Sequence, residues 1–257
     1  MSGSIVYLMY HELELAGREL CQSEPGYVRY IVSEPKFRGQ IGSLKQAGLR
    51  GMSVSEALTF PNQPGVAITF DDGCETDRIA AAPLLKDAGF GATFYITVGF
   101  MKGPGYLRET QVRELAEMGF EVGCHSMSHP YLTDLSNAEL RKELVDPKRR
   151  LEEMTGRAVE HFSCPGGRWD RRVAEVAREA GYKSVATSRN SANVMSTDPF
   201  SLGRVAVMRG TSPGRFEEIC RGHGLWQLRL REMAAAAAKR TMGNSGYEQL
   251  RRVVLGK

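Results

Sequence analysis

The chain has 257 residues, of which 42% are hydrophobic and 25% are charged, close to the averages of globular proteins. This composition excludes a largely disordered chain, and the formal net charge of +4 is too small to indicate a nucleic-acid partner. The length suits one α/β barrel or two small domains, and one domain is the simpler expectation.

The first residues show no export signal. No basic residue precedes the apolar stretch that begins at Ile5, and this stretch runs directly into His11 and Glu12. No later apolar run approaches the ~20 residues that a membrane-spanning helix needs. The 5 cysteines, an odd number without a Cys-x-x-Cys pair, are typical of reduced thiols rather than of a disulfide framework. We therefore expect a cytoplasmic protein without a transmembrane segment.

Short apolar runs predict the strands of the fold. They lie at residues 5–10, 66–70, 92–97, 120–125, 160–164, 183–187 and 204–208. Most are apolar throughout rather than alternating, which is typical of parallel strands buried on both faces.

Helical patterns separate these runs, at residues 34–47, 76–88, 110–118, 137–155 and 170–180. Glycines that accept a left-handed backbone are expected to end four of these helices, at Gly48, Gly89, Gly119 and Gly181. Ser136 and Glu139 form a capping-box pattern at the start of the longest helix.

Strands that alternate with helices in this way predict an α/β fold, an irregular (β/α)7-type barrel. A doubly wound open sheet is the alternative that spacing leaves open. We expect residues 1–210 to form the barrel and residues 211–257 to form a C-terminal helical appendage of the same domain. The appendage, with a helix at residues 225–240 and a basic tail, is expected to pack on the barrel. Its basic face is alternatively suited to a membrane surface or to a homodimer.

Two adjacent carboxylates, Asp71 and Asp72, follow the predicted strand at residues 66–70. In α/β barrels, sites are built at this C-terminal end of the strands. Neighbouring residues that leave a strand point in different directions, so one acid can bind a metal while the other moves a proton. A solvated Asp-Asp-Gly turn is the alternative without a function.

His125 and His129 lie at the end of a second predicted strand, four positions apart. At this spacing two imidazoles can share one helical turn and bind one ion. With Asp72 they form a ligand set that leaves positions open for water and substrate, as catalytic zinc sites do. We therefore expect a divalent transition metal, with Zn2+ the first choice and Ni2+, Co2+ or Mn2+ also compatible.

A third loop follows the predicted strand at residues 160–164. It is shaped by proline and glycine, and its arginine and tryptophan are candidates for hydrogen bonding to a sugar and for stacking on it. The candidate substrate-binding residues here are Pro165, Gly166, Gly167, Arg168 and Trp169. The alternative is an ordinary loop whose last residue, Asp170, caps the next helix.

Together these segments resemble the polysaccharide deacetylase family, also called the NodB-homology family or carbohydrate esterase family four. The sequence Thr-Phe-Asp-Asp-Gly at residues 69–73 matches the first family motif, and His-Ser-x-x-His at residues 125–129 matches the second. The resemblance covers about residues 5–208. The segments at residues 8–11 and 37–57 are similar to the branch that contains poly-N-acetylglucosamine deacetylases. The family fold is an irregular (β/α) barrel, in agreement with the pattern of strands.

The resemblance implies a hydrolase that removes an N-acetyl group from an amino sugar and releases acetate. The sugar would be a saccharide or a lipid-linked or nucleotide-linked precursor. Asp71 would be the catalytic base, and Asp72, His125 and His129 would bind the metal, a division that the residues also give when they are considered alone. The backbone N–H of Cys74, just after the acidic pair, is the candidate that stabilises the oxyanion.

The chain departs from the common family pattern at two points. The third motif usually carries an arginine that orients the catalytic aspartate, but the residue after Phe162 is Ser163. Arg168 is the candidate substitute. The late Leu-x-His motif, which supplies the general acid, is not visible near the last predicted strand. His11, at the end of the first predicted strand, is therefore the candidate acid or substrate contact.

Two other functions stay open at this stage. A formamide or cyclic-amide hydrolase on the same barrel would keep the metal and Asp71. A non-catalytic carbohydrate-binding protein would keep only the fold, but the intact acidic pair and both histidines favour an enzyme, since binding alone needs no site for a metal and water.

Overall fold

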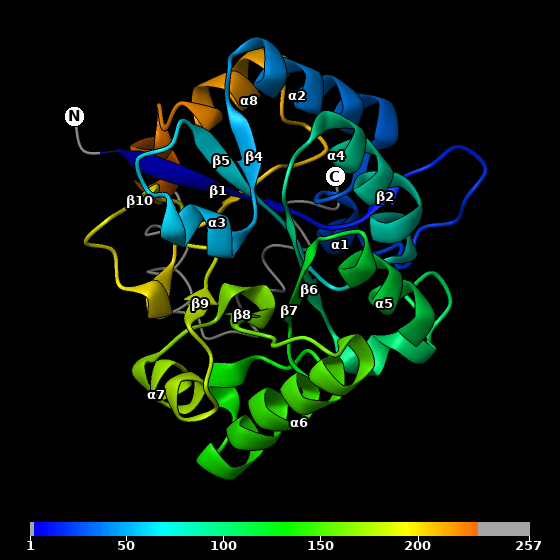
Figure 1. Cartoon of the computed structure of the whole chain (residues 1–257), viewed down its shortest axis with the longest axis vertical. Coiled ribbons are helices and arrows are strands. Elements are labelled where there is room, and N and C mark those ends of the chain that lie inside the picture. The colour runs from blue at the N-terminus through cyan, green and yellow to red at the C-terminus, as the bar shows by residue number, and fades with distance from the viewer. Residues whose placement is uncertain (1–2, 231–257) are drawn as a thin grey trace.

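A curled sheet forms the centre of the protein, and helices cover its outside (Figure 1). The structure is a computed structural model that describes residues 3–230. The strands of the main sheet run in the order β10-β1-β5-β6-β7-β8-β9, with β11 beside β1 and β4 beside β5. They are β1 (Ser4–Tyr10), β4 (Arg50–Met52), β5 (Gly65–Phe70), β6 (Thr93–Ile96), β7 (Glu121–Cys124), β8 (His161–Ser163), β9 (Ser184–Ala186), β10 (Asn193–Val194) and β11 (Val205–Ala206).

The sheet curls back onto its first strand. β11 pairs in parallel with β1, and just before β11 Leu202 forms a parallel bridge with Ala186 of β9. The predicted irregular (β/α) barrel is therefore confirmed, and the open doubly wound sheet is wrong. All seven predicted strands are present. The short strands β4, β10 and the separate pair β2 (Leu13–Glu14) and β3 (Val32–Ser33) were not predicted, since none has an apolar run.

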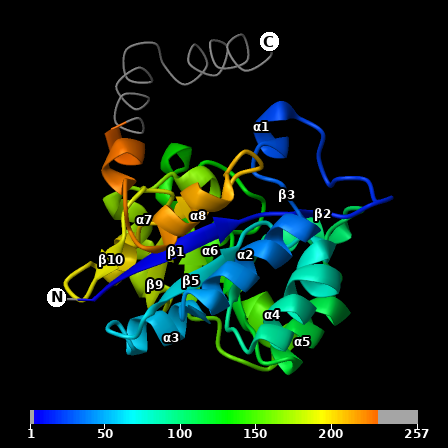
Figure 2. The same cartoon turned by 90° about the horizontal axis from the view of Figure 1, so that it is seen from above.

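The helices are α1 (Pro25–Val28), α2 (Glu34–Gln46), α3 (Val54–Thr59), α4 (Ala82–Ala88), α5 (Glu109–Glu117), α6 (Asn137–Thr155), α7 (Arg171–Glu179) and α8 (Pro213–Cys220). The predicted helix at residues 76–88 is split, because a π-helical turn at Asp77–Ala81 precedes α4. The four predicted stop glycines all have positive φ, between 67° and 93°, and the capping box of Ser136 and Glu139 is formed. Figure 2 shows α2 running alongside β1 and β5.

The sheet separates two groups of buried side chains. Along β1, Val6 and Leu8 pack with the helices in the larger cluster. Ile5 and Tyr7, which point to the opposite face of the strand, belong to a smaller cluster with residues of β5, β6, β9 and α3. Side chains on both faces of β1 are therefore buried, as its continuous apolar sequence predicts.

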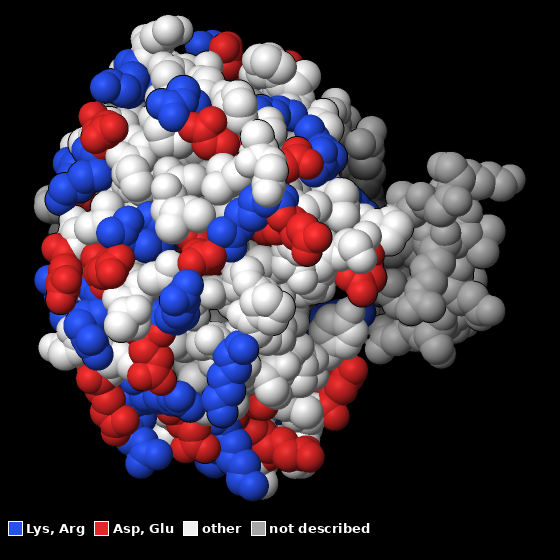
Figure 3. Space-filling model, turned by 90° about the vertical axis from the view of Figure 1, so that its right-hand side faces the viewer, with Lys and Arg blue, Asp and Glu red and all other residues white. Residues whose placement is uncertain are grey.

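The C-terminal part begins on the barrel surface. α8 contacts α2 and β1. In Figure 1, α8 and α2 lie side by side. Residues 225–230 are helical, but most of the predicted helix at residues 225–240 and the basic tail lie outside the described residues. Within residues 3–230, every helix is too short or too polar to cross a membrane. On the face in Figure 3, basic and acidic side chains are intermixed without a broad patch of one sign.

Candidate metal-binding active site

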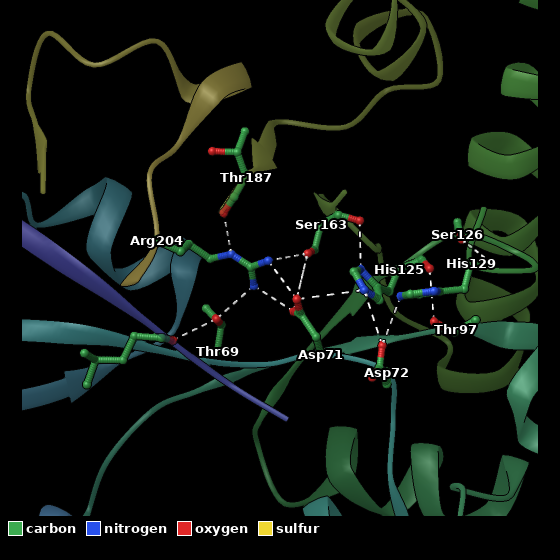
Figure 4. Close-up of polar contacts among 11 residues, drawn as sticks. Thr69, Asp71, Asp72, Thr97, His125, Ser126, His129, Ser163, Thr187 and Arg204 are labelled. Atoms are coloured by element: carbon green, nitrogen blue, oxygen red, sulfur yellow. Dashed lines mark hydrogen bonds and ion pairs between the residues drawn. The ribbon is translucent and has the colours of Figure 1, made fainter. Parts of the chain in front are cut away.

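The site lies where neighbouring parallel strands end. His11 follows β1, Asp71 follows β5 and His125 follows β7, while Ser163 is the last residue of β8. Because these strands are close neighbours in the sheet, their C-terminal ends lie close together, and Figure 4 shows the side chains of Asp71, His125 and Ser163 near one another. The predicted placement of the acidic pair and the histidines at one end of the barrel is therefore correct.

Asp72, His125 and His129 point toward a common position in Figure 4. Asp72 Oδ1 lies 3.5 Å from His125 Nε2 and 3.3 Å from His129 Nε2, and one ligand atom from each residue lies within 4.8 Å of the others. Within the described part of the chain, Asp72 Oδ1 is buried and has no hydrogen-bond partner. A buried carboxylate oxygen facing two imidazole nitrogens fits a divalent transition cation, which all three residues can ligate.

The segment that carries the two histidines is a loop, so the predicted helical turn is wrong. Ser126 and His129 have positive φ values of 69° and 61°, and Asp72 has a φ of 77°. Left-handed backbone at non-glycine residues is costly and is typical of functional sites. Ser126 Oγ accepts the His129 N–H at 2.9 Å, which stabilises the turn. The imidazoles therefore meet through two sharp backbone reversals, with their ring centroids 5.0 Å apart.

Contacts behind the histidines fix their orientation. His125 Nδ1 lies 2.9 Å from the Ser163 carbonyl oxygen, which leaves Nε2 to face Asp72. At metal sites, a hydrogen bond at the other ring nitrogen commonly orients a histidine ligand in this way. The backbone N–H groups of Met127 and Ser128 both donate to Glu143 of α6 at 2.9 Å. Burial lowers the pKa of His125 to about 4, so its imidazole is neutral at pH 7, which is the form that binds metals.

Asp71 is held by a buried arginine, Arg204. Two guanidinium nitrogens of Arg204 lie 2.7 Å from the two carboxylate oxygens of Asp71, and Arg204 also donates to Ser163 Oγ at 2.7 Å. Burial by itself would raise the pKa of Asp71, but the Arg204 charge and its hydrogen bonds outweigh burial and hold this pKa well below its usual range. Asp71 is therefore ionised and fixed in orientation at neutral pH.

Arg204 corrects the expectation that Arg168 contacts Asp71. The guanidinium of Arg168 instead lies over the ring of Tyr131, 4.7 Å from its centroid. Arg204 was missed because it is separated from Asp71 by 133 positions. One sequence feature points to Arg204, because it is the first residue of the last predicted strand. An arginine buried at a strand needs a partner such as a carboxylate, since an unpaired buried charge is strongly destabilising.

The third loop follows β8 beside the site, and one of its candidate sugar-binding side chains makes contacts within the protein. Gly166 and Gly167 have φ values of 58° and 66°, which shape the turn after β8. The Trp169 indole N–H donates to the Phe200 carbonyl at 2.8 Å, so this ring is packed rather than fully presented to solvent. Tyr131, which was not predicted, is 43% exposed beneath Arg168.

His11 leaves the sheet next to the acidic pair. The Asp71 N–H donates to the Tyr10 carbonyl at 3.0 Å, which aligns the ends of β1 and β5. The His11 ring lies 4.8 Å from the ring of Tyr30. Its Nδ1 is buried without a hydrogen-bond partner among the described residues. Cys74, after the positive-φ Gly73, is buried beneath the turn.

Residues 60–185 match the family model named polysaccharide deacetylase. The chain is 26% identical to YxkH of Bacillus subtilis over 215 residues, covering 81% of this chain and 73% of that protein. It is 34% identical to a peptidoglycan-N-acetylglucosamine deacetylase of Bacillus cereus over 130 residues, which cover 49% of this chain but only 58% of that protein. The solved structure of the Streptococcus pyogenes deacetylase PplD in complex with acetate is similar in fold, with a TM-score of 0.75 and 23% identity over 86% of this chain and 99% of that chain.

Proposed function

Since this chain belongs to the polysaccharide deacetylase family, we propose that it hydrolyses the N-acetyl group of an amino sugar and releases acetate. The single observation that carries this proposal is the separation of tasks between two adjacent carboxylates. Asp72 faces two imidazoles with a buried oxygen that has no hydrogen-bond partner among residues 3–230, whereas Asp71 is paired with Arg204. One acid is thereby suited to bind a cation and the other to accept a proton.

Asp72, His125 and His129 would hold the cation, with Zn2+ the first choice for this ligand set. When bound, a divalent cation supplies Lewis-acid activation of water and of the amide carbonyl. Asp71 acts as general base and accepts the proton of the attacking water, since it is ionised and its carboxylate plane is fixed by Arg204. The Cys74 backbone N–H stabilises the developing oxyanion.

The departing amine must gain a proton before it leaves. His11 is the candidate donor because it leaves β1 beside Asp71 and its buried Nδ1 has no protein partner among residues 3–230. An imidazole at this position can deliver a proton to the amine nitrogen as the C–N bond breaks.

The sugar would contact the third loop. Pro165, Gly166 and Gly167 bring this loop to the same end of the barrel, and Arg168 and Trp169 carry its hydrogen-bonding and stacking groups. The exposed ring of Tyr131 beneath Arg168 adds a flat apolar surface, which is typical of sites that stack on sugar rings.

The proposal is tested by metal analysis together with acetate release from N-acetylated glucosamine oligomers. Wild type is expected to retain a divalent transition ion and release acetate. Asp71→Asn should keep the ion but lose activity, and His125→Ala should lose both. Asp134→Asn, at an exposed aspartate, is the matched control and should resemble wild type. If wild type binds no ion under any loading condition, the hydrolase proposal fails and a non-catalytic carbohydrate-binding protein becomes the better interpretation. Metal binding without acetate release would point to formamides or cyclic amides as substrates.

A further inference from the structure

A second cluster of metal-ligating side chains lies beside the site, and the proposed reaction uses none of these three side chains. It consists of Glu12, Cys21 and Cys74, whose carboxylate oxygen and two sulfurs all lie within 4.8 Å of one another. Glu12 is 1% exposed and Cys74 is 0% exposed, while Cys21 is partly buried. Both thiols are free. The cluster therefore places two sulfur ligands and one oxygen ligand around a small volume that is largely closed to solvent.

Neighbouring groups hold the carboxylate of Glu12 against the sulfurs. The Cys21 N–H donates to Glu12 Oε2 at 3.0 Å. The Tyr27 hydroxyl lies 3.1 Å from Glu12 Oε2 and 3.3 Å from Cys74 Sγ, so its oxygen stands between two of the three groups. The Tyr27 hydroxyl therefore holds the Glu12 carboxylate and the Cys74 sulfur side by side.

The two segments that carry the cluster are tied together. The Leu13 N–H donates to Thr76 Oγ1 at 3.1 Å, which joins the residue after Glu12 to the turn that contains Cys74. The sulfur of Cys21 lies 3.1 Å from the Gly105 carbonyl oxygen. This oxygen also accepts the N–H of Glu75, the residue after Cys74, at 2.7 Å, so Gly105 links the loop before α1 to the turn. Contacts between the segments therefore position the three ligand residues.

A separate observation is a buried carboxyl group without a hydrogen-bond partner close to the cluster. Asp77 lies one turn after Cys74, and its N–H donates to the Cys74 carbonyl at 3.0 Å. Its side chain is 0% exposed, and among the described residues neither carboxylate oxygen has a hydrogen-bond partner. The nearby Arg18 is paired with Glu75 at 2.6 Å. Buried acidic groups without partners are costly, and a divalent cation close by would offset that cost.

We propose that Glu12, Cys21 and Cys74 form a second cation site, selective for ions that bind sulfur, such as Zn2+ or Cd2+. Thiolate ligands favour these ions over Mg2+ or Ca2+. On binding, each thiol releases its proton to solvent and forms a metal–sulfur bond, and the Cys21 thiol leaves the Gly105 carbonyl. The cluster of Asp72, His125 and His129 contains no sulfur, so the two sites differ in chemistry. The inference stands independently of the deacetylase activity.

Cadmium is the probe that separates the two sites. Only binding to thiolates produces an ultraviolet sulfur-to-cadmium charge-transfer band. We expect the metal-free full chain to develop this band when Cd2+ is added. The band should persist in His125→Ala, which removes a ligand of the other site, and should be lost in Cys21→Ser. Cys220→Ser, at a buried cysteine of α8, is the control and should keep it.

A wild-type chain that binds Cd2+ without the band overturns the proposal, as does a band that survives in Cys21→Ser. A second measurement needs no substitution. Cys21 is partly exposed, so iodoacetamide should alkylate it in the folded wild type, and Cd2+ should slow this reaction at least tenfold when followed by peptide mass spectrometry. Unchanged alkylation of Cys21 at saturating Cd2+ also contradicts the site. Neither measurement uses acetate release, so failure of this inference is distinct from failure of the proposed function.

Discussion

Two terminal nitrogens of Arg204 lie 2.7 Å from the two carboxylate oxygens of Asp71, and both side chains are buried. Arg204 directly precedes β11, a strand of two residues that pairs with β1. The same guanidinium donates to the Thr187 carbonyl after β9 at 2.9 Å. One side chain therefore links the segment after β9 to the start of β11 and also orients the proposed base.

Arg204→Lys should lower kcat by about 100-fold, the scale expected when a reacting group is misplaced by about 1 Å. Lysine keeps the positive charge but cannot donate two parallel hydrogen bonds to Asp71. KM and the metal content should stay close to those of wild type, because neither the ligands nor the sugar contacts change. Steady-state kinetics and metal analysis of the same preparation test this prediction.

Arg178→Lys is the matched control, because Arg178 is a partly exposed arginine of α7 whose guanidinium lies over Phe200. It should leave kcat unchanged. If Arg204→Lys instead reduced kcat only in proportion to the fraction of unfolded protein, measured by thermal melting, Arg204 would be structural rather than a positioning residue.

The sequence predicts most of the barrel because its strands are continuous apolar runs and its helices end at glycines. The prediction fails where a strand forms only because it pairs with a neighbouring strand, or where a helical turn has no distinguishing sequence pattern. β4 is Arg-Gly-Met, without an apolar run, and it becomes a strand because β5 lies beside it. The π-helical turn at Asp77–Ala81 has no local signal that separates it from an α-helix.

The residues of the site also fall into a predicted group and a missed group. Asp71, Asp72, His125 and His129 stand at strand ends in two short motifs, so local pattern is sufficient to bring them together. Arg204 is missed because a buried ion pair across 133 positions leaves no periodicity or spacing. The cluster of Glu12, Cys21 and Cys74 is hidden for the same reason, since three segments contribute one ligand each.

His11→Gln should separate acid catalysis from binding. With an N-acetylated sugar, whose amine must be protonated as it leaves, we expect kcat to fall by about 10²–10⁴-fold. With p-nitrophenyl acetate, whose phenolate leaves without a proton, the loss should be less than about tenfold. The comparison of the two substrates on one preparation is the measurement. An equal loss on both would assign His11 to substrate positioning instead.

Gly167→Ala should destabilise the protein more than a glycine substitution with the same backbone angle elsewhere. A Cβ at Gly167 would lie 1.7 Å from Ser188 Oγ, at a φ of 66°. At Gly48, with a φ of 67°, a Cβ would meet no atom within 4 Å. Gly48→Ala should therefore cost about 1–2 kcal/mol from the left-handed backbone alone, and Gly167→Ala about 1–3 kcal/mol more from overpacking. Urea unfolding of both variants measures the difference, and equal losses would show that Ser188 moves away without cost.

Glu121 at the start of β7 should make stability depend on acid pH. Its carboxylate accepts the Val54 N–H at 3.1 Å and lies 3.5 Å from His161 Nε2. Burial alone would raise the pKa of Glu121. The hydrogen bond with His161 and the charge of His161, together with hydrogen bonds from Ser55 and Thr93, outweigh burial and lower this pKa in the folded protein.

Because the folded pKa is below the ordinary value of 4.5, the ionised form stabilises the fold fully above that value. The stabilisation is lost as the pH falls from about 4.5 through the lower folded pKa. Glu121→Gln removes this ionisation, so its Tm should lie furthest below that of wild type near pH 7, and the gap should narrow below pH 4.5. Glu153→Gln, at an exposed glutamate of α6, should show no such narrowing. If the difference in Tm between wild type and Glu121→Gln stays constant across the acid range, Glu121 contributes through its shape and neutral hydrogen bonds. Only a carboxylate that ionises more readily in the folded state loses its stabilising effect at acid pH alone.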